Sequence, residues 1–155
     1  MHRNCQAVDA ALDAAGAIGR VRLLPEPAPT AAAAAEQLGV EVGAIANSLV
    51  FATGAAEPVL ILTSGAHRVD TARVAELLGA GSLTRASAQL VRSATGQPIG
   101  GVAPVAHPRP LRAVVDRALR EYPVVWAAGG IPHAVFPTTF DELLRLTGGL
   151  AGDVA

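Results

Sequence analysis

The sequence predicts a single α+β domain in which helices surround a mixed β-sheet that curves toward a barrel. The chain of 155 residues is long enough for one domain with one sizeable core. Its composition, 51% hydrophobic and 16% charged, is typical of a compact folded protein. Helical and strand-like segments alternate without a regular β-α-β period and without an internal repeat, which favours a mixed sheet. We therefore expect one domain over residues 1–155.

Capping residues and turns mark where the predicted helices and strands begin and end in the first third of the chain. In order, we expect a helix over residues 4–15 that Asn4 caps, a short strand over 19–24, a helix over 31–38 that Thr30 caps, and a helical turn over 42–46. Three prolines at positions 25, 27 and 29 interrupt regular structure between that strand and the helix after it.

The clearest β-hairpin of the sequence follows. Two apolar, β-rich segments, 48–53 and 58–63, are separated by a short turn. Beyond the hairpin we expect a helix over 70–78 that Asp70 caps, a helix over 87–93, an irregular segment over 100–104, strands over 111–115, 124–128 and 134–136, and a helix over 140–147.

Charge is distributed unevenly along the chain, although the net charge is only −1. Residues 68–120 hold eight arginines and three acidic residues, whereas the rest holds four arginines and ten acidic residues. Such a basic segment either binds phosphate groups or only keeps helix surfaces solvated, and the sequence leaves both readings open. All 12 basic residues are arginine, so the chain has no lysine.

The composition argues against several classes of protein. Aromatic residues make up 3% of the chain, which is too few for a platform that stacks single-stranded bases. The only cysteine, Cys5, cannot form an intramolecular disulfide and fits a reducing compartment. No segment reaches the ~18 apolar residues of a membrane span, and Asp9 and Asp13 interrupt what would be a signal peptide. We therefore expect a cytoplasmic protein that does not associate with a membrane.

Motifs for common cofactors are also missing. The four histidines lack the spacing of a metal site. The sequence contains no glycine-rich phosphate loop, no dinucleotide fingerprint and no nucleophile elbow. We therefore expect no metal and no cofactor.

The order of five segments is more specific than any one of them. The segments are 46–51 (ANSLVF), 59–65 (VLILTSG), 69–74 (VDTARV), 93–104 (SATGQPIGGVAP) and 126–133 (WAAGGIPH). This series resembles the YbaK/prolyl-tRNA-synthetase-associated editing domain family from about residue 30 to residue 149. The resemblance implies an α+β fold with a pocket between sheet and helices, and a free-standing deacylase that hydrolyses the ester of mischarged tRNA. It implies the aminoacylated 3′ end of tRNA as a partner, with an aminoacyl-tRNA synthetase as a further candidate.

The resemblance also implies the catalytic candidates. Gly100 and Gly101 match one Gly-Gly turn that lines the family's pocket, and Gly129 and Gly130 match the other. Glycine allows the backbone to approach a substrate closely, and its N–H groups can polarise an ester carbonyl. Asn47 occupies the position at which the best-known members have a lysine. Asparagine keeps hydrogen-bonding ability there but has no charge and cannot donate a proton as an acid.

Five further residues are candidates for substrate binding. His67 and His133 follow a strand end and the second Gly-Gly turn, and imidazole titrates near neutral pH. Arg68 and Arg92 are candidates for holding tRNA phosphate, and Ser64 for orienting a water molecule. Each also has a plain structural reading, as a hydrogen-bonded surface histidine, a solvated arginine or the end of a strand.

Three functions therefore stay open from the sequence. The first is an active aminoacyl-tRNA deacylase. The second, which the Asn47 substitution motivates, is an inactive relative that binds aminoacyl-tRNA or a nucleotide-like ligand without hydrolysis. The third is a protein that acts on an unrelated small ester or nucleotide. The amino acid removed, the tRNA that carries it and the oligomeric state are also open.

Overall fold

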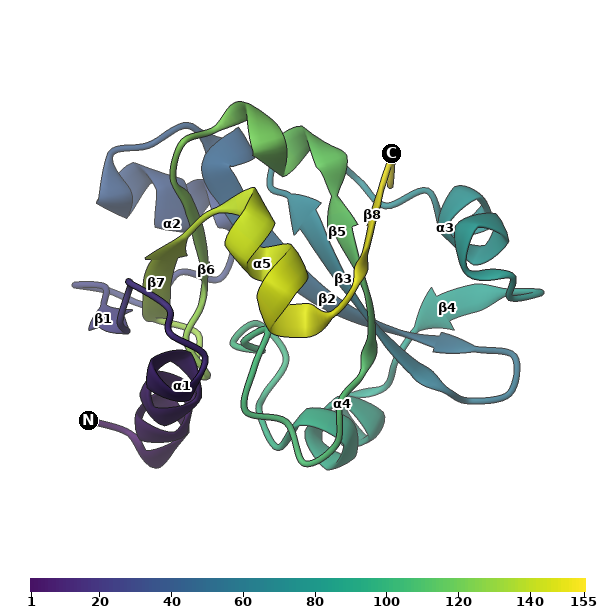
Figure 1. Cartoon of the computed structure of the whole chain (residues 1–155), viewed down its shortest axis with the longest axis horizontal. Helices are drawn as coiled ribbons and strands as arrows, with labels where there is room; N and C mark the ends of the chain where they lie inside the picture. Colours follow the sequence, from purple (N-terminus) through teal and green to yellow (C-terminus); the bar gives the residue numbers. More distant parts are fainter.

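One mixed sheet of eight strands organises the molecule, and the helices lie around it (Figure 1). The computed structural model describes residues 1–155. The strands are β1 (Arg22–Leu23), β2 (Ile45–Thr53), β3 (Pro58–Ser64), β4 (Leu83–Arg85), β5 (Arg112–Asp116), β6 (Val125–Ala128), β7 (Ala134–Thr138) and β8 (Leu150–Gly152). The helices are α1 (Arg3–Ala14), α2 (Ala31–Leu38), α3 (Thr71–Leu78), α4 (Ala88–Thr95) and α5 (Phe140–Thr147), with 3₁₀ turns η1 (Val42–Ala44) and η2 (Arg117–Glu121).

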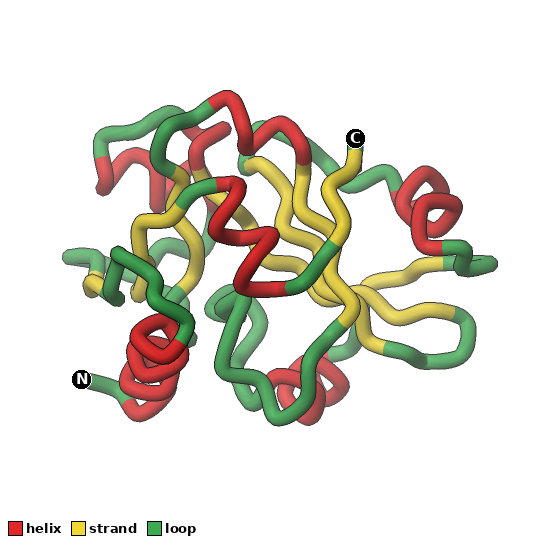
Figure 2. The backbone as a smooth tube through the Cα atoms, viewed as in Figure 1, coloured by secondary structure: helices red, strands yellow, loops and turns green.

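The sheet mixes parallel and antiparallel pairs, as the sequence predicts. The strand order is β1-β7-β6-β2-β3-β5-β8, and β4 pairs with β2 outside this order. Three pairs are parallel, namely β2 with β6, β3 with β5, and β5 with β8. Figure 2 shows the strands crossing the middle of the molecule with the helices outside them. The expectation of an α+β fold with a mixed sheet is thus confirmed.

One edge of β2 changes partners along its length. The other edge pairs with β3 without a break, from Ala46 to Ala52. On the first edge, Ile45 and Ala46 pair with β6, whereas Phe51 to Thr53 pair with β4. Residues 47–50 therefore have no strand partner on that edge, and the sheet is open between β6 and β4.

Hydrophobic side chains on the two faces of β3 form two separate cores. Leu60 and Leu62 belong to the larger core, in which α1, α4 and α5 cover the sheet. Val59 and Ile61 point the other way, because side chains alternate along a strand, and they pack with α3. A third cluster joins α2 to Trp126 on β6. Since both faces of β3 are buried, this strand is the centre of the fold.

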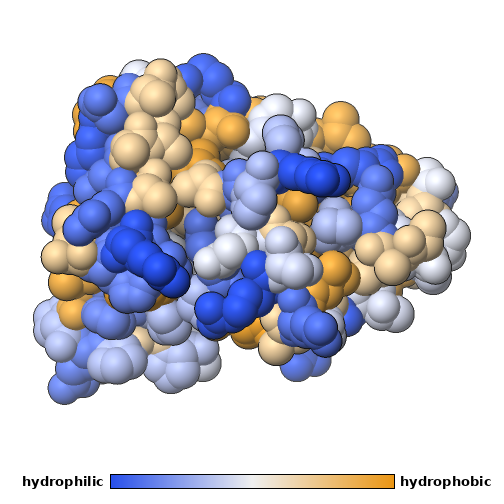
Figure 3. Space-filling view, turned by 90° about the horizontal axis from the view of Figure 1, so that it is seen from below, coloured by the Kyte–Doolittle hydropathy of each residue, from blue (hydrophilic) through white to orange (hydrophobic).

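The large hydrophobic side chains that stay exposed are dispersed along the chain. They are Met1, Ile18, Leu23, Leu77, Ile99, Val124 and Leu150. In the view from below, hydrophobic groups occur among hydrophilic ones (Figure 3). None of the helices combines the length and the apolar character that a bilayer crossing requires.

The structure shows which of the capping residues expected from the sequence begin a helix. Helices α2 and α3 begin at the predicted caps Thr30 and Asp70, whose side chains accept hydrogen bonds from backbone N–H groups of the first turn. The prediction for α1 is wrong, because the ring nitrogen of His2 caps this helix by accepting the Asn4 N–H at 3.0 Å. Asn4 lies inside the helix instead, where its side chain is free to contact another segment.

The elements that the sequence did not predict are all short. Strands β4 and β8 have three residues each, and the predicted strand over 19–24 shrinks to the two residues of β1. Segments of this length cannot display a hydrophobic period. Their strand geometry comes from pairing with β2, β5 and β7.

A buried carboxylate ties together the ends of the parallel strands β3 and β5. Asp116, which is 1% exposed, accepts hydrogen bonds from the backbone N–H of Ser64 at 2.9 Å and of Ala118 at 3.0 Å. Its Oδ2 also lies 2.8 Å from Nδ1 of His67. The chain segment that continues from β3 is thereby held in place.

Replacing Asp116 by Asn tests how much these hydrogen bonds contribute to stability. The Asp116→Asn change turns one acceptor oxygen into a donor, so at least one buried N–H loses its acceptor. Hydrogen bonds to charged groups contribute about 1.5–3 kcal/mol each, so we expect the free energy of unfolding in urea to fall by about 2–3 kcal/mol. Asp153→Asn is the matched control, since its carboxylate is 63% exposed and should contribute under about 1 kcal/mol. Equal losses in both variants would contradict this role.

Candidate active site

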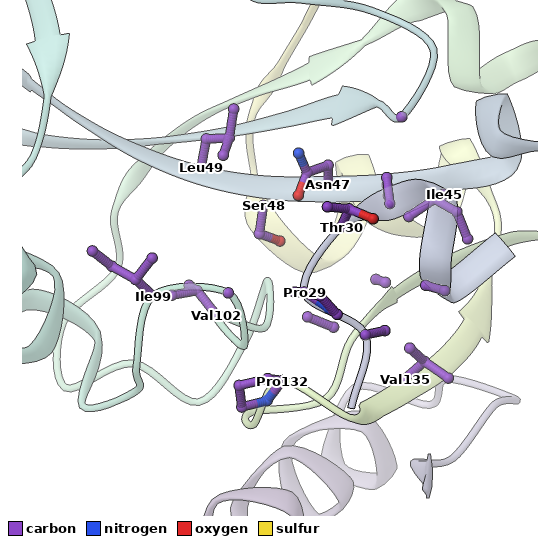
Figure 4. Close-up of a pocket in the computed structure, with 18 of the residues that line it drawn as sticks. Pro29, Thr30, Ile45, Asn47, Ser48, Leu49, Ile99, Val102, Pro132 and Val135 are labelled. Atoms are coloured by element: carbon purple, nitrogen blue, oxygen red, sulfur yellow. The ribbon is translucent and has the colours of Figure 1, made fainter. Parts of the chain in front are cut away.

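A cavity of about 480 Å³ lies where β2 loses its strand partner (Figure 4). Its walls come from the start of α2, residues 45–50 of β2, the segment that follows α4, and the strands β6 and β7. The volume is within the range of ~300–1,000 Å³ that is typical of small-molecule sites. The open edge of the sheet is therefore the floor of a site that can take a ligand.

The two Gly-Gly corners of the chain meet at this cavity. A Cβ atom added to Gly101 would come within 2.5 Å of the carbonyl carbon of Ile131, the residue directly after the second Gly-Gly pair. The two loops thus touch backbone to backbone, and only a glycine leaves room for this contact. Gly100 and Pro132, which flank the contact, both line the cavity.

The first corner is a tight turn that projects one glycine into open space. The Gly101 N–H donates to the Pro98 carbonyl at 3.0 Å, which closes a four-residue turn. Gly100 has a φ of +87°, the sign that a type II turn requires at its third position. No atom lies within 4 Å of the place where a Gly100 side chain would begin. The Gly100 backbone is therefore accessible from the cavity.

The second corner is held by contacts on its outer side. The Gly129 N–H donates to the Ala134 carbonyl at 2.7 Å, and the Gly130 carbonyl accepts from the side chain of Asn4 at 3.0 Å. These bonds fasten the corner to β7 and to α1. The backbone N–H groups of Gly101 and Gly129 are thus already used within the chain, which leaves Gly100 as the glycine donor that lines the cavity.

Two consecutive polar residues of β2 line the cavity with different surroundings. Asn47 and Ser48 lie on opposite sides of the β2 ribbon, as alternation along a strand requires (Figure 4). Both residues are half-buried, and the Ser48 hydroxyl points from the strand into the cavity. The Ser48 Oγ atom is buried and has no hydrogen-bond partner in the chain. Sequence analysis did not single out Ser48, because the burial of its hydroxyl depends on tertiary packing.

Arg85 is the only ionisable residue among those that line the cavity. It lies on β4 at the edge of the cavity, with its guanidinium carbon 5.6 Å from the centre of the Phe51 ring, a cation–π contact. Its side chain is exposed, and its guanidinium is absent from the five ion pairs of the structure. The cavity therefore has a positive group at its rim and no carboxylate, histidine, cysteine or lysine in its walls. Sequence analysis missed Arg85 because it did not predict β4.

The five predicted substrate-binding residues lie outside the lining of the cavity. Ser64 is buried, and its hydroxyl donates to the Gly43 carbonyl at 2.8 Å. His67 contacts Asp116 as described above, and the backbone carbonyl of His133 accepts from the Leu24 N–H at 2.7 Å. Arg68 and Arg92 are exposed. A contact of these residues with a bound tRNA stays a prediction.

The remaining reactive side chains are in the core or in loops away from the cavity. Burial, followed by the nearby Asp9 charge, raises the pKa of the Cys5 thiol above its ordinary value, so this cysteine stays protonated at neutral pH. Burial lowers the pKa of His107, whose Nε2 lies 2.7 Å from the Ala103 carbonyl oxygen. Histidine, cysteine and acidic side chains form no group of three that could ligate a metal ion.

Comparison with known proteins places the cavity in a functional context. A family model described as an aminoacyl-tRNA editing domain matches residues 25–146, which include β2, β4 and both Gly-Gly corners. The chain is similar to the crystal structure of a candidate trans-editing enzyme for prolyl tRNA synthetase, with 42% identity and a TM-score of 0.92 over 99% of this chain and 98% of the other. It is also similar to the hypothetical protein APE2540, with 32% identity and a TM-score of 0.87 over 96% and 98% of the two chains.

The contact between the two corners predicts the effect of adding one methyl group. Gly101→Ala would force the two loops apart, and overpacking of this kind typically costs about 1–3 kcal/mol of unfolding free energy. Gly81→Ala is the matched control, because no atom lies within 4 Å of its added Cβ and its φ is not positive. We expect the control to unfold in urea within about 0.5 kcal/mol of the natural protein. If Gly101→Ala behaves like this control, the two corners are not in contact in solution.

Proposed function

The chain belongs to the aminoacyl-tRNA editing domain family, and from this we propose that it hydrolyses the ester that joins a wrong amino acid to the 3′ end of tRNA. The observation that carries the proposal is the meeting of the two Gly-Gly corners at one cavity of about 480 Å³. The cavity offers a backbone donor, three neutral polar side chains (Thr30, Asn47 and Ser48) and one cation. These groups match the aminoacylated terminal nucleotide of tRNA, which has a carbonyl, hydroxyls and a phosphate.

The walls of the cavity determine which chemical steps the protein can perform. They contain no side chain that acts as a general base or as a nucleophile at neutral pH. Hydrolysis then proceeds by direct attack of water on the ester carbonyl, with the Gly100 N–H placed to donate to the oxygen that becomes negative. Removing one such donor from other hydrolases costs about 2.7–4 kcal/mol of transition-state stabilisation.

The substrate itself supplies the groups that move the proton. Water adds to the carbonyl carbon, and the bond from this carbon to the ribose 3′-oxygen breaks. The proton lost by water passes to that oxygen, with the neighbouring ribose 2′-hydroxyl as the relay. The other proposed catalytic residues hold the geometry: Gly101, Gly129 and Gly130 shape the corners, and Asn47 donates a hydrogen bond from the wall.

Arg85 is proposed to bind the phosphate next to the terminal adenosine. It is exposed at the rim of the cavity, and no acidic side chain neutralises it. Guanidinium groups bind phosphate through two parallel hydrogen bonds. In this chain, which has no lysine, Arg85 supplies the positive charge that Asn47 lacks. Charged tRNA is used in the cytoplasm, where this reaction and any contact with a synthetase would take place.

A second function, binding without hydrolysis, is favoured by one observation. Asn47 has no charge and cannot donate a proton as an acid. The only ionisable side chain in the walls is the strongly basic Arg85. A pocket of this kind could retain an aminoacyl-tRNA without cleaving it. The two functions differ in whether the amino acid is released after binding.

Single-turnover hydrolysis of mischarged tRNA distinguishes these functions. We expect the purified protein to release at least one amino acid from a panel of mischarged tRNAs faster than buffer, and Gly81→Ala to retain that rate. Tight binding with no release would instead establish the binding function, and a gain of activity in Asn47→Lys would then identify the missing charge. Neither binding nor release across the panel would refute both.

The proposed phosphate contact predicts a change in KM. Arg85→Gln should raise KM for aminoacyl-tRNA about tenfold and leave kcat within about twofold, because the contact is made equally in the ground state and the transition state. It should also lower the slope of log affinity against log salt by about 1. Arg73→Gln, which changes an exposed arginine of α3 outside the cavity, is the matched control. Equal KM values in the two variants would exclude Arg85 as the phosphate ligand.

A further inference from the structure

The hydroxyl of Ser48 is the one buried side-chain polar atom that has no hydrogen-bond partner in the chain. Leaving such a group unpaired costs about 1–3 kcal/mol, and native proteins contain few of them. Ser64, only 16 positions further on, shows the ordinary arrangement. Its hydroxyl donates to the Gly43 carbonyl at 2.8 Å and accepts from the Ala66 N–H at 3.3 Å. The unpaired state of Ser48 therefore calls for a partner from outside the chain.

The position of Ser48 shows where this partner would lie. Ser48 shares a face of β2 with Ala46 and Val50, which are 2% and 4% exposed. In Figure 4 its hydroxyl points from β2 into the cavity, toward the side where Val102 and Pro132 lie. The cavity around this face is walled by small apolar side chains, which are Ala46, Val50, Val91, Val102, Ala127 and Ala134. Ser48 thus adds a hydroxyl to an apolar wall of the cavity. The other hydroxyl of the lining, that of Thr30, already accepts from the Ala33 N–H at 3.1 Å.

The mouth of the cavity is exposed and charged. Arg85 and Gly100 are exposed there, and Ile99 is 48% exposed. The aminoacylated end of tRNA has a large part that carries phosphate, the terminal nucleotide, and a small part, the amino acid. Charge and size therefore orient the nucleotide toward Arg85 and the amino acid toward Ser48.

The backbone of β2 supports this orientation. The Val50 carbonyl accepts from the Ala86 N–H at 3.1 Å on the edge that faces away from β3. Because alternate residues of a strand direct their N–H and C=O groups to the same edge, those of Ser48 face the gap between β6 and β4. The Ser48 carbonyl can accept from the α-amino group that all amino acids share, which brings the amino acid side chain next to the Ser48 hydroxyl.

From these observations we propose that Ser48 determines specificity by hydrogen-bonding the side chain of the amino acid to be removed. The preferred substrate is a small amino acid with a hydroxyl, the class of serine and threonine, over alanine. This inference rests on the proposed function and adds the substrate class. A site that hydrogen-bonds a substrate hydroxyl discriminates against the analogue that lacks it, because the site is then left unpaired.

The first test is kinetic and compares one tRNA charged with serine or with alanine. A net hydrogen bond of 0.5–1.5 kcal/mol corresponds to a preference of up to about tenfold. We expect kcat/KM for the seryl ester to exceed that for the alanyl ester about tenfold in the natural protein, and this ratio to approach one in Ser48→Ala. Ser48→Thr, which keeps the hydroxyl, should retain a preference for the seryl ester.

Two outcomes would overturn the inference while the protein still hydrolyses aminoacyl-tRNA. One is a ratio near one in the natural protein. The other is that Ser48→Ala lowers the hydrolysis rates of both esters but leaves the ratio of their kcat/KM values unchanged. The hydroxyl would then contact a part of the substrate that the two esters share. Failure of the proposed function gives a different result, namely no hydrolysis of either ester.

A binding measurement tests the inference even without hydrolysis. The probes are two stable amides, 3′-serylamino-3′-deoxyadenosine and 3′-alanylamino-3′-deoxyadenosine. We expect the seryl amide to bind about tenfold more tightly to the natural protein and equally to Ser48→Ala. Equal affinity of the natural protein for both amides would refute the inference.

A stability comparison of the two serines checks that Ser48 is unpaired in the free protein. Ser48→Ala removes a hydroxyl without breaking a bond, so the midpoint of urea unfolding should stay or rise. Ser64→Ala breaks two hydrogen bonds, one buried and one partly buried, so its midpoint should fall. A fall in Ser48→Ala as large as in Ser64→Ala would show that the Ser48 hydroxyl has a partner in the chain and would overturn the inference.

Discussion

The change of partners along one edge of β2 is the constraint on which the site depends. Strand β3 holds the other edge of β2 from Ala46 to Ala52, so β2 stays extended while β6 and β4 separate beside it. An unpaired strand edge in a protein is normally covered, because its N–H and C=O groups need partners. Here the edge is covered by loops that leave a cavity between themselves and the strand. The sheet thus supplies polar backbone and side-chain groups to a space whose other walls are apolar.

The contact between the Gly-Gly corners closes the far side of that space. Gly101 lies against the backbone of Ile131, and bonds from Gly129 and Gly130 fasten the second corner to β7 and α1. The N–H groups of Gly101 and Gly129 are therefore used to fix the loops, and Gly100 is the one corner glycine that lines the cavity. The corners act first as a rigid frame. A rigid frame matters for ester hydrolysis, because a donor stabilises the transition state only if it is in place before the charge develops.

Local features of the fold were predictable, and features that depend on distant contacts were not. The caps Thr30 and Asp70 and the hairpin can be read from neighbouring residues, and the family resemblance carried by the ordered motifs is confirmed by the match over residues 25–146. Arg85 was missed because β4 is three residues long and becomes a strand only by pairing with β2. The burial of the Ser48 hydroxyl could not be read either, because it depends on how the chain packs around the cavity. The sequence can therefore identify the pocket but not all of its polar groups.

The chemical character of the cavity suggests how selectivity and catalysis are divided. Aminoacyl esters are reactive, so a site without a basic side chain can still release the amino acid if it orients water and polarises the carbonyl. Discrimination then has to come from binding. Small apolar walls exclude large side chains by size, but size separates serine from alanine poorly, since one small group in an apolar pocket is worth little. A buried hydroxyl without a partner in the chain supplies what size does not, because serine can hydrogen-bond to it and alanine cannot. Ser48 is therefore better explained as part of the substrate-binding surface than as a defect of the core.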